Sequence, residues 1–237
     1  MEFRKLKAED IECRISQITS SWCSLLLYKT SRCDMNILDE TVGSMNWERE
    51  HKELKGNIYC GVSIYNKETE DWVIKWDAGK ESYTESEKGE ASDSFKRACV
   101  NWGIGRELYT SPSIFITPRA DMTKRGKDSE FYTNEKGKVE TKTRFSVYYI
   151  DYDDNRNIKD LIIKDEKGHI RFQLVSDELA NRTLDLQKEL HELLRQLENK
   201  DDNFDRNKVY EHYVSELDMT FIEYEDAIEI CKKKLES

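Results

Sequence analysis

The sequence predicts an α+β fold, in which an antiparallel β-meander is packed by helices and followed by a helical, acidic C-terminal region. Three observations carry this prediction. Residues 45–79 alternate apolar and polar side chains in three short runs separated by turn residues, which is typical of sequential antiparallel strands. Apolar residues recur at helical spacing on either side of these runs, in residues 32–43 and 89–103. From residue 176 onward the spacing of apolar residues is helical only.

The chain before the meander is predicted to contain one clear helix. Residues 1–16 show little apolar pattern and are expected to form an arm or a weak helix, and residues 21–28 are the first strongly apolar run. A helix is expected over residues 32–43, with Gly43 ending it. Its predicted buried side carries Cys33, Ile37 and Leu38.

The meander is expected to consist of strands over residues 45–54, 58–65 and 72–79. Lys55-Gly56-Asn57 is a hairpin signal, and residues 66–71 form a second turn. Several aromatic rings in or beside these strands could offer stacking faces to bases, but most of them are expected to lie in the core. These rings are Trp47, Tyr59, Tyr65, Trp72, Trp76 and Trp102.

The helix over residues 89–103 is predicted to bury one face and to turn two adjacent cations away from it. Ser92 or Asp93 is a candidate N-cap, and Gly103 is suited to the left-handed conformation that ends a helix. Lys96 and Arg97 lie off the apolar stripe. The stripe itself is Ala91, Phe95, Ala98 and Trp102, with Cys99 close to it.

The rest of the body is expected to contribute further strands. Residues 114–117 and 144–151 each have a strand pattern, and residues 161–174 are expected to form a hairpin about Lys167-Gly168. The charged residues 121–142 are either a solvated loop or a mobile basic flap.

The C-terminal region is predicted to be helical. Three stretches indicate three helices. The first has apolar residues at heptad-like spacing, a pattern called the seam below. The second contains Val209 and Tyr213, and the third contains Ile222 and Ala227. We therefore expect residues 1–175 to form one domain and residues 176–237 a helical acidic region. The seam residues are Leu179, Thr183, Leu186, Leu190, Leu193 and Leu197.

The net charge of −10 is unevenly distributed. Residues 176–237 hold 9 Lys+Arg against 17 Asp+Glu, whereas residues 1–175 hold 29 against 31. Because the body is nearly neutral, it can still carry a basic groove for nucleic acid. The six cysteines form no CxxC pair. We expect their thiols to be reduced, as in a cytosol, and mostly buried inside the protein. No run of 18 apolar residues exists, so no membrane span is expected.

Signatures of several catalytic and cofactor sites are absent from the sequence. There is no Walker A loop for nucleotide phosphates, and the four histidines lack metal-ligand spacing, so we predict no cofactor and no metal site. Asp151, Asp153 and Asp154 could be the carboxylates of a metal-dependent nuclease. The alternative is a turn after a strand, because Asn155 and Asn157 follow directly and Asp and Asn favour turns.

Several stretches together resemble the annealing domain of the Rad52 family, including its phage-borne relatives. They are residues 38–47 (LDETVGSMNW), the meander with Gly61, Asp77-Ala78-Gly79 and the helix motif of residues 91–103. The resemblance extends well over residues 25–115, loosely over residues 140–175, and not into the C-terminal region. The positions that fit the helix motif of the family are Asp93, Lys96, Arg97, Ala98, Trp102 and Gly103.

The resemblance implies ATP-independent binding and annealing of complementary single strands in homologous recombination and double-strand break repair, without catalysis. It implies a homo-oligomeric ring or helical assembly with a basic groove, in which Lys96 and Arg97 hold phosphates. Arg32 lies about one position away from the place where the family carries another cation of the groove. Val100 stands where some members carry an arginine. The alternatives are weaker strand binding, or charge supplied by Arg106 or by residues 119–144 instead.

The acidic region has several possible roles. It could mimic a strand, support assembly, or dock a single-strand binding protein or another replication protein. The expected location is the cytoplasm, that of a bacterial host if the chain is phage-borne. Two other functions stay open, namely the nuclease and an adaptor that acts through its coiled tail without DNA affinity.

Overall fold

The computed structural model describes residues 1–79, 86–119, 129–201, 203–213 and 218–236. It contains helices and antiparallel sheets, which confirms the predicted α+β class. The chain divides into two compact units, and each is described by itself. The domain boundary near residue 176 stays a prediction. The first unit comprises Met1–Ile18, Cys23–Ile114 and Tyr152–Ile158, and the second comprises Thr19–Trp22, Phe115–Asp151 and Lys159–Ser237.

The N-terminal residues form structure where an arm or a weak helix was expected. A 3-10 turn over Ala8–Asp10 leads into β1 (Glu12–Ile18), which pairs antiparallel with β2 (Cys23–Tyr28). In β1 the half-buried side chains of Cys13 and Ile15 alternate with exposed ones, and the alternation shifts at an irregularity between Ile15 and Gln17. Pairing with the apolar strand β2 holds this short run as a strand. Phe3, Leu6 and Ile11 are buried.

The predicted helix before the meander is confirmed as α1 (Ser31–Val42). Thr30 caps it, because its hydroxyl accepts a hydrogen bond from the backbone N–H of Cys33. Gly43 ends the helix at φ +86°, a conformation that favours glycine. The side chains of Cys33, Ile37 and Leu38 are buried as predicted.

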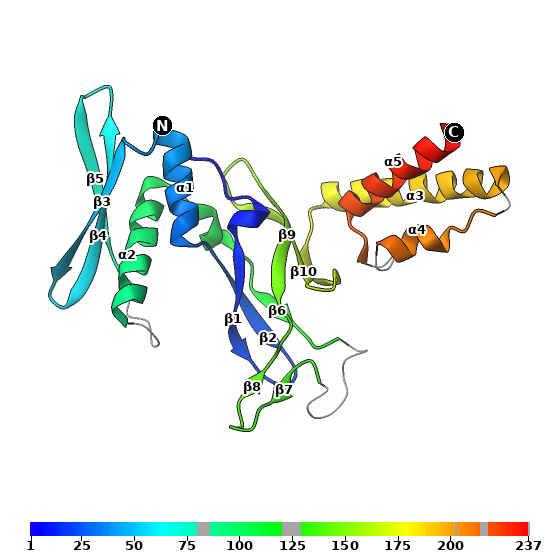
Figure 1. The fold of residues 1–237 in the computed structure, drawn as a ribbon, viewed down its shortest axis with the longest axis horizontal. Helices are drawn as coiled ribbons and strands as arrows, with labels where there is room; N and C mark the ends of the chain where they lie inside the picture. The colour runs from blue at the N-terminus through cyan, green and yellow to red at the C-terminus, as the bar shows by residue number, and fades with distance from the viewer. Residues whose placement is uncertain (80–85, 120–128, 202, 214–217, 237) are drawn as a thin grey trace. The chain divides into compact units, whose positions relative to one another are not determined.

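The predicted meander is a three-stranded sheet of β3 (Trp47–Leu54), β4 (Asn57–Asn66) and β5 (Asp71–Ala78), in the order β3-β4-β5. Lys55 and Gly56 both have positive φ in the first turn, which matches the twist of a tight hairpin. α2 (Ser86–Trp102) lies along one face of this sheet, and α1 lies beside α2 (Figure 1).

The centre of the apolar stripe of α2 is buried as predicted, its ends Ala91 and Trp102 are half-buried, and the predicted N-cap is wrong. Phe95, Ala98 and Cys99 have no exposed surface. The helix begins at Ser86, so Ser92 and Asp93 lie inside it rather than at its start. Gly103 follows the last helical residue at φ +106°, as expected.

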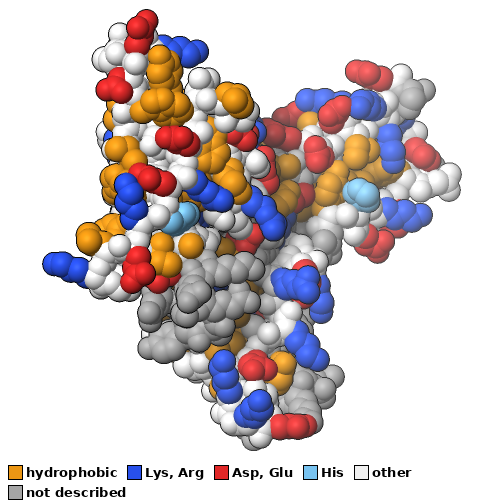
Figure 2. Space-filling view, turned by 60° about the vertical axis from the view of Figure 1, so that its left-hand side comes forward, with side chains coloured by type: hydrophobic (Ala, Val, Ile, Leu, Met, Phe, Trp, Pro, Cys, Tyr) orange, Lys and Arg blue, Asp and Glu red, His pale blue; other side chains and the backbone are white. Residues whose placement is uncertain are grey.

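The sheet face turned away from α2 is apolar and aromatic. Tyr65 is opposite Trp72, and Gly61 is opposite Trp76. A Cβ atom at Gly61 would come within 2.7 Å of Ile74 and Trp76, so these side chains lie flat across the glycine. Trp72 is 43% exposed and Ile74 39%. Figure 2 shows hydrophobic side chains gathered over the sheet among charged ones.

The expectation that most of the six rings lie in the core is therefore wrong. None of them is fully buried. Trp47 stacks on Phe95 of α2 with ring centroids 6.1 Å apart, while Tyr65 contacts Trp72 edge-on at 5.5 Å on the far face. A three-stranded sheet with a helix on one side has only one covered face, and the alternation alone does not tell which side is covered.

The second unit begins with short strands. They are β6 (Ile114–Ile116), which confirms the predicted strand, and the small hairpin of β7 (Tyr132–Thr133) and β8 (Val139–Glu140). Of the charged segment at residues 121–142, residues 121–128 lie outside the described part. The strands β9 (Phe145–Tyr152), β10 (Ile158–Asp165) and β11 (Ile170–Leu174) are neighbours in the order β11-β10-β9. The predicted hairpin about Lys167-Gly168 is β10–β11.

Three helices complete the second unit, as predicted: α3 (Asp177–Lys200), α4 (Asn207–His212) and α5 (Phe221–Glu236). α3 and α5 pack on each other around Leu190, Leu194 and Leu197, of which Leu194 was not in the predicted seam. Among the described residues, no helix has both the length and the apolar character needed to cross a bilayer. All six cysteines are free thiols, and Cys13 alone of them is not buried.

Candidate nucleic-acid interface

A pocket of about 230 Å³ lies beside the middle of α2 and holds the two predicted cations. Three elements of the first unit build it: the end of β2, the exposed side of α2, and the 3-10 turn η2 (Arg106–Thr110) that follows α2. Its lining is Leu27, Tyr28, Lys29, Asp93, Lys96, Arg97, Val100, Gly105, Leu108 and Tyr109. Three cations against one carboxylate make this lining suited to an anion.

Lys96 and Arg97 differ in how firmly they are held. The Nε atom of Arg97 lies 3.3 Å from Oδ1 of Asp77 on β5, with the arginine side chain 40% exposed. Asn101 also donates a hydrogen bond to Asp77 at 3.3 Å, which fixes that carboxylate. Lys96 has no ion pair within the described residues and is half-buried. One cation is thus positioned by the sheet, and the other is available to a ligand.

A buried ion pair supports the pocket, and its lysine belongs to the pocket lining. Lys29 is 5% exposed and its ammonium group pairs with Asp34 of α1, which has no exposed surface. The same Nζ atom donates to the backbone carbonyl oxygen of Lys96 at 3.4 Å. Lys29 therefore links α1 to the segment of α2 that carries the basic pair.

The carboxyl group of Asp34 shows the cost of this burial. Its Oδ2 atom has no hydrogen-bond partner in the part of the chain that the structure describes. Burial raises the pKa of Asp34 to about 6, although the charges of Lys29 and Lys96 act to lower it. At neutral pH the carboxylate is charged and neutralises Lys29, so the positive charges that a ligand in the pocket can meet are those of Lys96 and Arg97.

Gly105 closes the pocket at φ +74°. A Cβ atom there would overlap Cε of Lys29, so only glycine allows the chain to pass this close to the buried lysine. A glycine at this position thus allows both the close contact between the backbone and Lys29 and the turn into η2.

The other two predicted cations lie apart from Lys96 and Arg97. Arg32 is exposed at the second position of α1 and has no ion pair among the described residues. The hydroxyls of Ser31 and Ser92 are 3.4 Å apart, so Arg32 lies next to a contact between α1 and α2. Arg106 instead donates to the carbonyl oxygens of Val100 and Asn101, at 2.8 and 2.9 Å. That guanidinium caps the C-terminus of α2, a structural task that sequence reasoning did not anticipate.

The three candidate nuclease carboxylates lie at the end of β9, where a turn was the alternative. Asp153 accepts hydrogen bonds from the backbone N–H groups of Asn155 and Asn157, and from the side chain of Asn157. Both of its carboxylate oxygens thus serve the turn, as the turn interpretation predicted. Within the described residues, no group of three His, Cys, Asp or Glu side chains could hold a metal ion.

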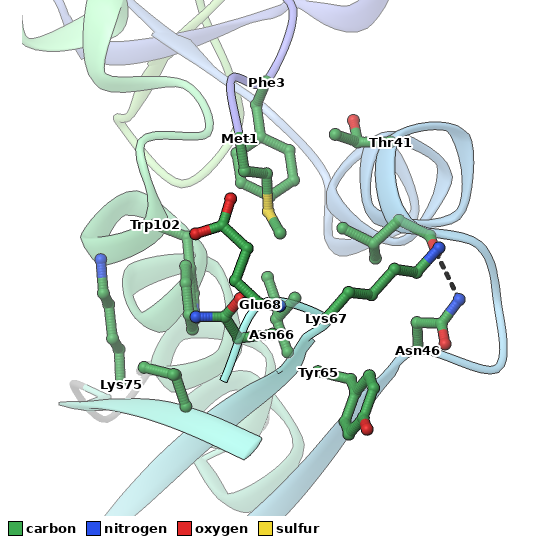
Figure 3. A pocket seen from close by; sticks show the side chains of 13 residues that line it. Met1, Phe3, Thr41, Asn46, Tyr65, Asn66, Lys67, Glu68, Lys75 and Trp102 are labelled. Atoms are coloured by element: carbon green, nitrogen blue, oxygen red, sulfur yellow. Dashed lines mark hydrogen bonds between the residues drawn. The ribbon is translucent and has the colours of Figure 1, made fainter. Parts of the chain in front are cut away.

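A second and larger hollow, of about 540 Å³, lies between the C-terminus of α1 and the β4–β5 turn (Figure 3). Lys67 and Glu68 reach into it from the turn, and Trp102 and Lys75 lie on one side of it. The Nζ atom of Lys75 is 4.3 Å from the centroid of the Trp102 ring and donates to Asn101 O at 3.0 Å. Two lysines and one glutamate line this hollow, against three cations and one carboxylate in the pocket at Lys96, so it is the poorer match for a phosphate backbone.

Comparison with known proteins gives one significant match. Residues 57–125 match the Rad52/22 family of double-strand break repair proteins. No characterised protein and no solved structure matches the chain significantly. The predicted resemblance to the Rad52 family is thereby confirmed over this part of the chain.

The matched segment contains most of the basic pocket. It runs from β4 through β5, α2 and η2 into the region after β6, so it includes Lys96, Arg97 and Arg106, while Arg32 lies before it. The match of this segment to the Rad52/22 family indicates a process of DNA repair and recombination, with DNA binding and self-association as general properties of that family. Proteins of this family anneal strands and are not classical enzymes.

Sequence reasoning missed two residues that shape the pocket. Lys29 directly follows an apolar run in the sequence. That position was the signal from which a buried cation could have been predicted. Asp77 was noted only as part of a motif, and its pairing with Arg97 required the register of the sheet on α2.

Proposed function

We propose that this protein binds single-stranded DNA and anneals complementary strands without ATP, in recombination or double-strand break repair. The observation that carries the proposal is the pocket at Lys96 and Arg97, inside the segment that matches the Rad52/22 family. Annealing needs no chemical step. It needs a strand held by its phosphates while the base edges stay free to pair, and two cations on a rigid helix supply phosphate contacts of this kind.

The proposal includes assembly into a ring or helical array. A pocket with two or three cations contacts few phosphates, but repetition around an oligomer multiplies these contacts along one strand. The sheet β3-β4-β5 has features suited to self-association. Its edge strands β3 and β5 each pair only with β4 among the described residues, and its outer face exposes Trp72 and Ile74.

The acidic C-terminal helices have a separate place in the proposal. We propose that they dock on a basic surface of a partner, such as a single-strand binding protein or another replication protein. We also propose that the protein acts in the cytoplasm. The exposed ion pairs along α3 and α5, including Lys188–Asp185 and Lys232–Glu189, support a solvated surface rather than a second strand groove.

The test is the annealing of two complementary labelled oligonucleotides without ATP, with strand affinity measured over a salt series. Wild-type protein is expected to accelerate annealing and to lose affinity by about 0.7 log units per phosphate contact per log unit of salt. The double variant Lys96→Glu, Arg97→Glu is expected to lose strand binding and annealing while the oligomer stays intact, because both side chains are partly exposed.

A matched control is the double charge reversal Lys188→Glu, Arg195→Glu on α3, where the side chains are 74% and 75% exposed. It changes the net charge equally and is expected to leave annealing unchanged. Equal losses in both double variants would show that only net charge matters. Annealing that survives the Lys96 and Arg97 reversal would remove the pocket from the proposal, and magnesium-dependent cleavage would favour the nuclease.

A further inference from the structure

One wall of the basic pocket is an aromatic ring with no described partner. Tyr109 lines the pocket together with Lys96 and Arg97, and its side chain is 72% exposed. No other aromatic residue that the structure describes is as exposed. A tyrosine that buries so little of its ring gains little from packing, so the fold does not explain its position beside two cations.

The turn that carries Tyr109 is anchored on both sides of it. Glu107 is 1% exposed and accepts hydrogen bonds from Leu6 N at 2.6 Å and from Arg156 Nη2 at 3.5 Å. The hydroxyl of Thr110 accepts from Ile158 N at 2.9 Å. The backbone at Tyr109 is therefore held in place, and a ring presented from a fixed backbone loses little conformational entropy when it binds a ligand.

The other tyrosine of the pocket, Tyr28, has a hydrogen-bond partner on a neighbouring strand. Tyr28 donates a hydrogen bond from its hydroxyl to the carboxylate of Glu12 on the neighbouring strand. Its ring is thus oriented by β1 and forms part of the wall, whereas the ring of Tyr109 is free to meet a ligand.

We propose that Tyr109 stacks on one base of the strand whose phosphates contact Lys96 and Arg97. This inference rests on the proposed function and adds a contact to a base. Stacking uses the face of the base and leaves its Watson–Crick edge exposed, so the bound strand stays able to pair. It also tolerates every base, which suits a protein that leaves sequence recognition to the second strand.

The experiment compares two strands of equal length, oligo(dT) and an abasic deoxyribose-phosphate oligomer, binding to wild type, Tyr109→Ala and Tyr109→Phe. On oligo(dT), Tyr109→Ala is expected to lower affinity at least about fivefold, the loss of one stacked base, with the slope of log affinity against log salt unchanged. Tyr109→Phe keeps the ring and is expected to stay within about twofold of wild type. On the abasic strand, wild type and Tyr109→Ala are expected to bind equally.

The matched control is Phe115→Ala, which removes another ring that is 57% exposed but does not line the pocket. It is expected to leave both affinities unchanged. A penalty of Tyr109→Ala that is equal on both strands, or absent on oligo(dT), overturns the stacking contact while the annealing proposal stands. Wild-type protein that binds neither strand overturns both.

Discussion

At the scale of single residues, the basic pocket depends on a lysine that does not face solvent. Lys29 is held between Asp34, the carbonyl oxygen of Lys96 and the backbone at Gly105. Removing one partner of such a pair leaves an uncompensated buried charge, which is strongly destabilising. The position of Lys96 therefore depends on residues far from it in sequence, and Gly105 offers a direct test.

We expect Gly105→Ala to lower the free energy of unfolding by more than the backbone alone explains. Alanine at φ +74° costs about 1–2 kcal/mol, and its Cβ must also push Lys29 away from Asp34, for a total of at least about 3 kcal/mol. Urea unfolding measures the loss. Gly56→Ala is the control, because its φ is +77° and a Cβ there meets nothing within 4 Å. Equal losses in the two variants would show that Lys29 adapts freely.

At the scale of elements, α5 is tied to the strands of the second unit by one carboxylate. Glu223 pairs with Lys164 of β10 and accepts a hydrogen bond from the hydroxyl of Tyr148 on β9 at 2.6 Å. It also accepts hydrogen bonds from the backbone N–H of Thr220, at 2.8 Å, and from the Thr220 hydroxyl, directly before the start of α5. These contacts hold the pKa of Glu223 below its usual value, against the effect of burial. The C-terminal helices are therefore joined to the strands through buried polar contacts.

We expect Glu223→Gln to lower stability by about 3 kcal/mol, because Lys164, 8% exposed, loses its counter-charge. Denaturant unfolding measures this loss, and hydrogen exchange of α5 amides shows where it acts. Glu229→Gln, on the same helix, removes an exposed pair with Lys233 and is expected to change little. If both variants behaved alike, the carboxylate of Glu223 would be dispensable for holding α5.

At the scale of the whole molecule, the outer face of the sheet β3-β4-β5 is the surface on which the proposed assembly depends. Trp72, at 43% exposure, is expected to lie in the contact between copies. Trp72→Glu should dissociate the oligomer, as measured by light scattering after size exclusion. Strand affinity should fall with it, because linked pockets bind one strand more tightly than separate ones.

Met45→Glu is the control for this change, since Met45 is 87% exposed in the turn before β3. It is expected to leave the oligomer intact. An oligomer that persists in Trp72→Glu would remove this face from the assembly contact and leave the strand edges as the alternative.

The sequence by itself determined the features that depend on local spacing. The apolar stripe of α2 predicted which side of that helix is buried, and its complement predicted Lys96 and Arg97 at a surface. Residues 32–43 were recognised as a helix because its apolar spacing and its glycine stop agree. These signals lie within a few residues of each other, and periodicity records them directly.

Only the tertiary structure decided what depends on contacts between distant segments. β1 is a strand because β2 pairs with it, and the aromatic face of the meander is open because α2 covers the opposite one. Arg106 was predicted to meet phosphate, whereas its guanidinium caps α2. Lys29 is buried because Asp34 and Gly105 close around it. Alternation in a strand gives two faces without naming the buried one, and a charge in a sequence does not show its partner, so these features required the folded chain.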